Sequence, residues 1–214
     1  MNIQILFILF MIYAVIGWAF ETIICSIMDK KFANRGFFIG PYLPIFGIGA
    51  ILITFILSNY QKDILVLFIM SAVLGAVLEY ISSYLLEKIF NTRWWNYEID
   101  KFNLNGRVCL SATICFGALG VILIEVLNPF FIETIKSIPQ LTLNIIFIIL
   151  LVIFITDMIV SITIISKIKS KNFGKSKDTT EEVTKKVREA LKNGSIFSKR
   201  LINAFPDLKI SNRK

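Results

Sequence analysis

The sequence contains no histidine and only three cysteines, Cys25, Cys109 and Cys115. Without histidine, the chain lacks the commonest metal ligand and the usual base of nucleophilic catalysis. An odd number of cysteines without metal-ligand spacing also argues against a disulfide framework and a zinc site. We therefore expect no metal and no cofactor, and we interpret the cysteines as small apolar packing residues.

A nucleotide-binding motif is missing as well. The tripeptide "GKS" at 174–176 is the nearest approach to a phosphate-binding loop. Such a loop needs a glycine five residues earlier, where this chain has Lys169, and no strand precedes it. We therefore expect no nucleotide site in this chain, and the sequence leans away from an enzyme.

Positive charge is scarce outside the C-terminal tail. Residues 167–214 hold 14 lysines and arginines against 5 acidic residues, a net charge of +9, whereas residues 1–166 carry a net charge of −1. A basic tail of this kind is typical of a cytoplasmic segment close to anionic lipid. Membrane lipid is therefore an expected partner, and we expect no nucleic acid.

Apolar residues are abundant and make up 56% of the chain. Apolar runs of roughly 18 or more residues are typical of transmembrane helices. The first run lacks the basic start and the small-residue cleavage site of a signal peptide, so we interpret it as a retained span. The sequence predicts an all-α polytopic membrane protein with about five transmembrane helices, at about 3–28, 44–60, 64–86, 108–128 and 141–166. These spans form a transmembrane domain over 1–166.

Basic residues in the loops predict the orientation. The loops 29–43 and 87–107 hold three and four lysines or arginines, and the other two loops hold one each. Because positive charge stays on the cytoplasmic side, both basic loops and the tail are expected there, with the N-terminus outside. The protein is therefore predicted to be a multi-pass protein of the cell (cytoplasmic) membrane.

The start of the second span is ambiguous. The stretch "GFFIGPYLPIFG", residues 36–47, is apolar but holds two prolines and three glycines, which break a helix. Irregular backbone at membrane depth must be buried in protein or line a wet cavity. The stretch is predicted to be either a re-entrant, half-unwound segment or an interfacial loop.

An internal repeat is visible in the apolar part. An offset of 58 aligns "AVIGWAFETI" at 14–23 with "AVLGAVLEYI" at 72–81, and after an insertion the offset becomes 70. We predict two copies of a unit of two spans and a loop, at about 3–60 and 64–128, followed by an unpaired fifth span. Because the first and third spans run the same way, the repeat is parallel, as in many transporters.

Two glutamates lie at equivalent places in this repeat. Glu21 and Glu79 each follow a glycine by four residues inside an apolar run. Acids buried in the membrane need partners, protons or water. We expect the pair to face a polar cavity open to the cytoplasm, with Asp157 also lining it and Arg35 and Arg107 at its mouth. The alternative is an intramembrane salt bridge that only fixes helix packing.

The segment "NTRWWNYEIDKFNLNGRVCL", residues 91–110, is rich in aromatic and asparagine residues. Its aromatic side chains are typical of a belt at the level of lipid headgroups. Amides beside an arginine can also bind a phosphate or carboxylate. Besides the acids and arginines above, the candidate substrate-binding residues are Asn34, Trp94, Trp95, Tyr97, Asn103 and Asn105.

The tail carries one segment with clear helix signals. "TTEEVTKKVREALKNG", residues 179–194, begins with capping residues and acids and ends at a glycine. We predict a helix at about 180–193 that is amphipathic. It would lie on the inner leaflet or dock a partner.

Several of these stretches together resemble one known family. The blocks "GWAFE", "NRGFFIGPYLPIFG", "LEYISSYLLEKIF", "WWNYEIDKFNLNGRVCL" and "RLINAFP" are similar to the CmpB-like family, labelled "putative ABC-transporter type IV" or ABC transporter permease. The resemblance spans nearly the whole chain, with a departure at Asn96, where the family often has aspartate. It implies a transport component whose ATPase is a separate subunit, contacted by the 87–107 loop or by the tail.

The sequence therefore favours an integral membrane, permease-like transport component that lacks its own ATPase and has a cytoplasm-facing polar site. Five spans are few for a whole translocation path, so a homodimer is expected. Two other functions stay open. One is a membrane-embedded enzyme or binding protein for lipid headgroups, and the other is a membrane scaffold that recruits partners through its tail.

Overall fold

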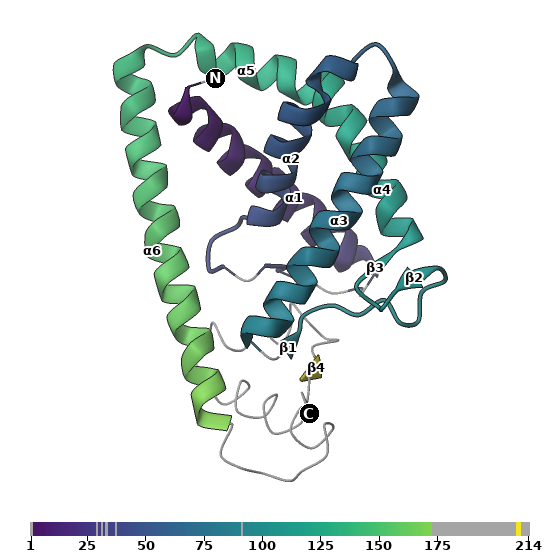
Figure 1. Cartoon of the computed structure of the whole chain (residues 1–214). Coiled ribbons are helices and arrows are strands. Elements are labelled where there is room, and N and C mark those ends of the chain that lie inside the picture. Colours follow the sequence, from purple (N-terminus) through teal and green to yellow (C-terminus); the bar gives the residue numbers. More distant parts are fainter. Residues whose placement is uncertain are drawn as a thin grey trace.

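The computed structural model describes residues 2–28, 30, 32, 34–36, 38–90, 92–172 and 209–210. These residues form a mostly helical bundle, drawn in Figure 1. The helices are α1 (Ile3–Met28), α2 (Pro44–Leu57), the 3₁₀ turn η1 (Ser58–Tyr60), α3 (Ile64–Phe90), α4 (Leu110–Ile122), the π-helical segment η2 (Leu123–Leu127), α5 (Asn128–Lys136) and α6 (Gln140–Asn172). The strands are β1 (Thr92–Arg93), β2 (Asn103–Leu104), β3 (Val108–Cys109) and β4 (Lys209–Ile210).

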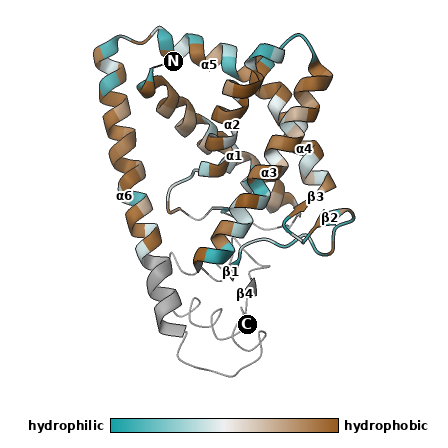
Figure 2. Cartoon of the chain, viewed as in Figure 1, coloured by the Kyte–Doolittle hydropathy of each residue, from teal (hydrophilic) through white to brown (hydrophobic). Residues whose placement is uncertain are grey.

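Four helical stretches are long and apolar enough to cross a membrane. They are Ile3–Ile27, Ile64–Ile89, Leu110–Lys136 and Gln140–Thr163. Their residues are mostly apolar, as the brown ribbon in Figure 2 shows, and many of their large apolar side chains are exposed. Exposed apolar side chains of this kind are covered by lipid or by another apolar surface, so the helices fit a membrane protein.

The remaining predicted span, 44–60, is a shorter apolar helix. It consists of α2 and η1, which together cover Pro44–Tyr60. At about 1.5 Å per residue this helix is about 25 Å long, less than the roughly 30 Å of a hydrocarbon core. The irregular residues 38–43 precede it.

The last two residues before α2, Tyr42 and Leu43, are buried in the protein. Pro44 occupies the first turn of α2, where a fixed φ and a missing N–H are tolerated. Tyr42 is 3% exposed, and the backbone N–H of Leu43 donates to the carbonyl of Ala14 in α1 at 2.9 Å. Of the two alternatives left open by the sequence, an unwound segment packed inside the bundle describes residues 42–43 better than an interfacial loop.

The third long helical stretch, Leu110–Lys136, continues beyond residue 128, where the predicted span ends. Pro129 lies in the first turn of α5, directly after the π-helical segment η2. A π-segment rearranges the backbone hydrogen bonds, so the missing N–H of a proline can be accommodated without ending the helix. The helical stretch therefore reaches Lys136.

Close packing joins α1 to α2 and α3 to α4 at glycines. A Cβ atom added to any of these glycines would overlap a phenylalanine of the partner helix. The contacts are Gly17 with Phe46 and Gly47 with Phe10 between α1 and α2, and Gly75 with Phe116 and Gly117 with Phe68 between α3 and α4. Glycine is therefore required at these places for the helices to approach so closely.

The last helix, α6, stands to one side of the bundle in Figure 1. It contacts α1 through aromatic rings: Phe154 lies 6.0 Å from Phe7 and 5.4 Å from Phe10, centroid to centroid. Only 6% of its most apolar window is buried inside the protein. Most of its surface is therefore available to lipid or to another protein.

The two basic loops lie at the same end of the bundle as the C-terminal end of α6 (Figure 1). The N-terminus, the α2–α3 turn and the α5–α6 turn lie at the opposite end. At the loop end, β1 pairs antiparallel with β4. The predicted tail helix at about 180–193 lies outside the described residues.

Candidate functional site

The loop after α3 folds back onto the bundle through a short hairpin. Strands β2 and β3 pair antiparallel, and Asn105 and Gly106 between them both have positive φ, 54° and 65°. This conformation is typical of an Asn-Gly hairpin turn. The Asn103 side chain accepts a hydrogen bond from the N–H of Gly106 at 2.9 Å and closes the turn. Asn103 and Asn105 therefore stabilise the turn of this hairpin.

Glu79 lies on α3, 7% exposed. Its Oε1 accepts a hydrogen bond from the Tyr97 hydroxyl at 2.9 Å. Its Oε2 is buried and has no hydrogen-bond partner among the described residues. One half of this carboxyl group is therefore satisfied by the loop, and the other half is not.

Glu21 lies on α1 and forms an ion pair with Arg35. Glu21 Oε1 and Arg35 Nε are 3.3 Å apart. The segment that carries Arg35 is held on α1 by neighbouring contacts: Trp18 Nε1 donates to Asn34 Oδ1 at 3.0 Å, and the Arg35 N–H donates to Thr22 Oγ1 at 3.4 Å. Arg35 therefore contacts Glu21 directly, and Asn34 contacts Trp18 on the same helix.

Tyr97 connects the two glutamates electrostatically. Burial raises the pKa of the Tyr97 hydroxyl far above its ordinary value, and the charge and hydrogen bond of Glu79, then Cys109 and Glu21, raise it further. Because the pKa is raised, the hydroxyl keeps its proton throughout the neutral range and remains a donor. Both carboxylates therefore lie within electrostatic reach of one hydroxyl group.

Arg107 is held by an acid that the sequence reading did not single out. Its Nη2 lies 2.8 Å from Glu87 Oε2, and its Nη1 donates to Ser83 Oγ at 3.1 Å. The guanidinium carbon lies 5.7 Å from the ring centroids of both Tyr80 and Tyr84. These four partners recur at three- and four-residue intervals on α3, so the sequence shows that they share one face of the helix, but it does not show that Arg107 returns to that face.

The tryptophans of the loop pack it against the bundle. Trp94 is 5% exposed, so it does not belong to an interfacial aromatic belt. Trp95 Nε1 donates to the carbonyl of Arg107 at 3.0 Å, and Asn105 Nδ2 donates to the Tyr80 hydroxyl at 3.0 Å. These contacts fix the position of the loop on α3.

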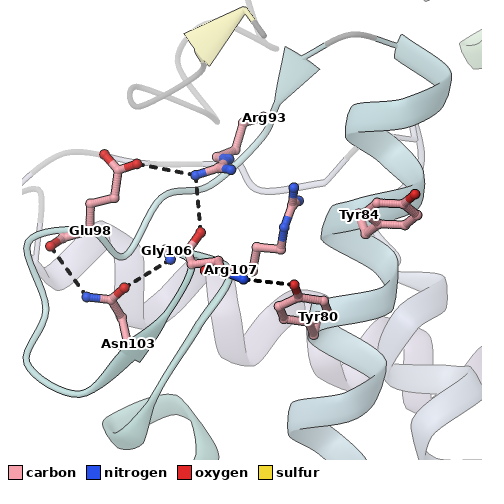
Figure 3. A pocket seen from close by; sticks show the side chains of 8 residues that line it. Tyr80, Tyr84, Arg93, Glu98, Asn103, Gly106 and Arg107 are labelled. Carbon is pink, nitrogen blue, oxygen red and sulfur yellow. Dashed lines mark hydrogen bonds and ion pairs between the residues drawn. The ribbon is translucent and has the colours of Figure 1, made fainter. Parts of the chain in front are cut away.

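A cavity of about 510 Å³ lies between this loop and α3. Figure 3 shows Tyr80 and Tyr84 on the helix, with Arg93 and Arg107 approaching from the loop side. The lining residues are Tyr80, Tyr84, Arg93, Glu98, Asn103, Asn105, Gly106 and Arg107. Both arginines also contact Glu87, since Arg93 Nε lies 3.2 Å from its Oε2. The cavity could hold a small polar group, but Glu21 and Glu79 do not line it.

Asp157 binds a different part of the chain from the two glutamates. Its Oδ1 accepts from the N–H of Ile39 at 3.0 Å and from Ser161 Oγ at 2.7 Å. Its Oδ2 accepts from the N–H of Gly40 at 2.7 Å and from the Tyr42 hydroxyl. The expectation that Asp157 lines a cavity with Glu21 and Glu79 is therefore replaced by a contact between α6 and the irregular segment before α2.

Apolar helices of membrane length, with a polar site at one end, fit an integral membrane protein. Residues 8–162 match the family described as "Putative ABC-transporter type IV", and the chain belongs to this family, which confirms the resemblance stated from the sequence. The family and the apolar helices together fit a membrane transport component. No curated protein and no solved structure is significantly similar to the chain.

Within the part of the chain that the structure describes, no group of three or more histidine, cysteine, aspartate or glutamate side chains could hold a metal ion. The polar groups at the loop end are instead carboxylates, guanidinium groups, amides and hydroxyls. Such groups bind charged or hydrogen-bonding solutes, lipid headgroups or protons.

Proposed function

We propose that the chain is a permease-like transport component without its own ATPase, with its polar site facing the cytoplasm. The observation that carries this proposal is that Glu79, which is hydrogen-bonded to Tyr97, and Glu21, which is paired with Arg35, come from two separate apolar helices and both act electrostatically on the Tyr97 hydroxyl. Ionisable residues inside membrane bundles mark solute or ion pathways. The family description supports the same function.

The predicted parallel repeat is part of this proposal and is supported by the packing. The contact of Gly17 with Phe46 and that of Gly75 with Phe116 are related by the offsets of 58 and 70 found in the sequence. The rings of Phe46 and Phe116 themselves lie 6.5 Å apart. Equivalent residues are expected to meet in this way around a pseudo-twofold axis. In transporters built from repeats, the site lies where the two halves meet.

The tip of the 92–109 loop is the proposed contact for a separate ATPase subunit. Ile99, Phe102 and Leu104 are 99%, 81% and 58% exposed at this tip. Exposed apolar side chains in one short loop are typical of a docking surface. Since the family is one of ABC transporters, whose ATPase this chain lacks, an ATPase subunit is the partner that fits.

Replacing both Ile99 and Phe102 by serine is expected to lower the amount of co-purifying ATPase subunit at least tenfold, because the apolar contact is lost. The measurement is quantitative mass spectrometry of the tagged protein purified from its native membrane. Ile64→Ser serves as the control, because Ile64 is 63% exposed at the opposite end of the bundle. Equal ATPase retention in both variants would show that the tip is not the docking surface, and the absence of any ATPase subunit at fixed ratio from the wild-type preparation would contradict ATP-coupled transport.

A protein that binds or modifies lipid headgroups is the second candidate function. The cavity of about 510 Å³ favours it, because guanidinium groups and tyrosines are suitable partners for a phosphate and its substituent. Native mass spectrometry is expected to detect one retained phospholipid that is lost in Arg93→Gln if this function is correct. A wild-type protein that carries no stoichiometric phospholipid argues for the transport function instead.

A homodimer remains part of the proposal, since the largely unburied face of α6 offers an apolar surface. The scaffold function proposed from the tail concerns residues 173–208, which lie outside the described part of the chain.

A further inference from the structure

Among the described residues, the polar site around Tyr97 carries one more negative charge than positive charge. Near Tyr97, the carboxylates of Glu21 and Glu79 are accompanied by one guanidinium group, that of Arg35. The neighbouring cluster is balanced, because Arg93 and Arg107 are paired with Glu87 and Glu98. Since Arg35 is the ion-pair partner of Glu21, the carboxyl group without a countercharge is that of Glu79.

The surroundings of Glu79 supply no positive charge to its free oxygen. The loop contributes the neutral Tyr97 hydroxyl, which donates to Oε1 only. From α1, Glu21 contributes a second negative charge that is paired with Arg35, and β3 contributes Cys109 near the same hydroxyl. Oε2 is therefore a buried acceptor without a donor among the described residues. A fully ionised carboxylate in this position would be strongly unfavourable.

The cation that fits this oxygen is a proton. Oε2 is buried, so an ammonium group or a metal ion cannot reach it unless the surrounding side chains move. A proton needs no such space. In the neutral acid, Oε2 carries the hydrogen, and Oε1 becomes the carbonyl oxygen that keeps the hydrogen bond from Tyr97.

We propose that Glu79 is the proton-binding residue of the transport site. The proton comes from water at the loop end of the bundle and bonds to Oε2, and its release regenerates the carboxylate. This inference rests on the proposed transport function, since a site that gains and loses one proton per cycle can couple solute movement to pH. Tyr97 is a positioning residue that holds Oε1 and leaves Oε2 as the titrating atom.

Infrared difference spectroscopy of the purified protein in lipid nanodiscs tests the proposal, with the proton itself as the probe. The difference between acidic and alkaline samples is expected to contain the C=O stretching band of a protonated carboxyl group. This band should disappear in Glu79→Gln and move to higher frequency in Tyr97→Phe, because Oε1 then loses its hydrogen bond. Glu133→Gln, an exposed acid at the opposite end of the bundle, is the control that should leave the band unchanged.

Size-exclusion chromatography shows whether each variant is folded, and Glu79→Asp provides a second, milder change that should shift the band. A band that survives in folded Glu79→Gln, or a band in Tyr97→Phe at the wild-type frequency, would overturn the proposal. The spectra do not depend on an ATPase subunit or a solute. A protein that shows the Glu79 band but co-purifies with no ATPase subunit at fixed ratio would contradict the ATP-coupled transport function while leaving the proton site in place.

Discussion

Replacing Arg107 by glutamine is expected to lower the free energy of unfolding by about 3 kcal/mol, because breaking a buried ion pair from one side costs about 3–5 kcal/mol. Glu87 and Arg107 are 8% and 9% exposed, and their charged atoms lie 2.8 Å apart. We expect the lower end of this range because Arg93 stays 3.2 Å from the same carboxylate oxygen. The measurement is thermal unfolding in detergent, where this change corresponds to a fall in Tm of roughly 10 °C.

The double variant Glu87→Gln with Arg107→Gln separates the lost ion pair from the lost side chain. If the cost comes from an uncompensated buried charge, the double variant should be more stable than Arg107→Gln alone. If the double variant loses as much free energy of unfolding as the two single variants together, the two residues do not act as a pair. Lys101→Gln, an exposed cation in the same loop, is the matched control and should change Tm by less than about 2 °C.

Replacing Asp157 by alanine is expected to cost about 3 kcal/mol or more and to release α6 from the bundle. The carboxylate accepts hydrogen bonds from the N–H groups of Ile39 and Gly40 and from the Tyr42 hydroxyl. Each donor left unsatisfied costs about 1–3 kcal/mol. The backbone at Gly40 lies close to Asp157, since a Cβ atom at Gly40 would lie 3.0 Å from Asp157 Oδ2.

Hydrogen exchange of the Ile39 and Gly40 amides gives the most direct readout of the Asp157 contact. Both amides should exchange at least tenfold faster in Asp157→Ala, while amides in the middle of α3 keep their wild-type protection. Ser161→Ala removes one donor to the same carboxylate and should cost only about 1 kcal/mol. Unchanged exchange at both amides in Asp157→Ala would contradict this account of how α6 is attached.

Much of the architecture could be predicted from the sequence, because it depends on local properties. Apolar runs of membrane length predict helices wherever they occur. The proline and glycine content of residues 36–47 predicted a break, and residues 38–43 are indeed non-helical. The end of the helix that follows was also predictable. The apolar run stops at Leu57 and the polar residues Ser58–Asn59 follow, and in the structure α2 ends at Leu57 with a 3₁₀ turn over Ser58–Tyr60.

The glutamates illustrate what sequence alone determined about the site. Glu21 and Glu79 stood out because an acid in an apolar run is costly and because both follow a glycine at the same spacing. This reasoning depends only on residue type and local order. It identified which side chains need partners, while the longer sequence blocks identified the family to which the chain belongs.

Only the tertiary structure decided which partners these side chains have. Arg107 pairs with Glu87 across a loop that returns to its own helix, and Asp157 binds Ile39 at a separation of 118 residues. Such pairings depend on the path of the chain between helices, which side-chain periodicity does not encode. The same is true of Glu79, whose buried and unpaired oxygen follows from the way Tyr97 approaches only one side of the carboxyl group.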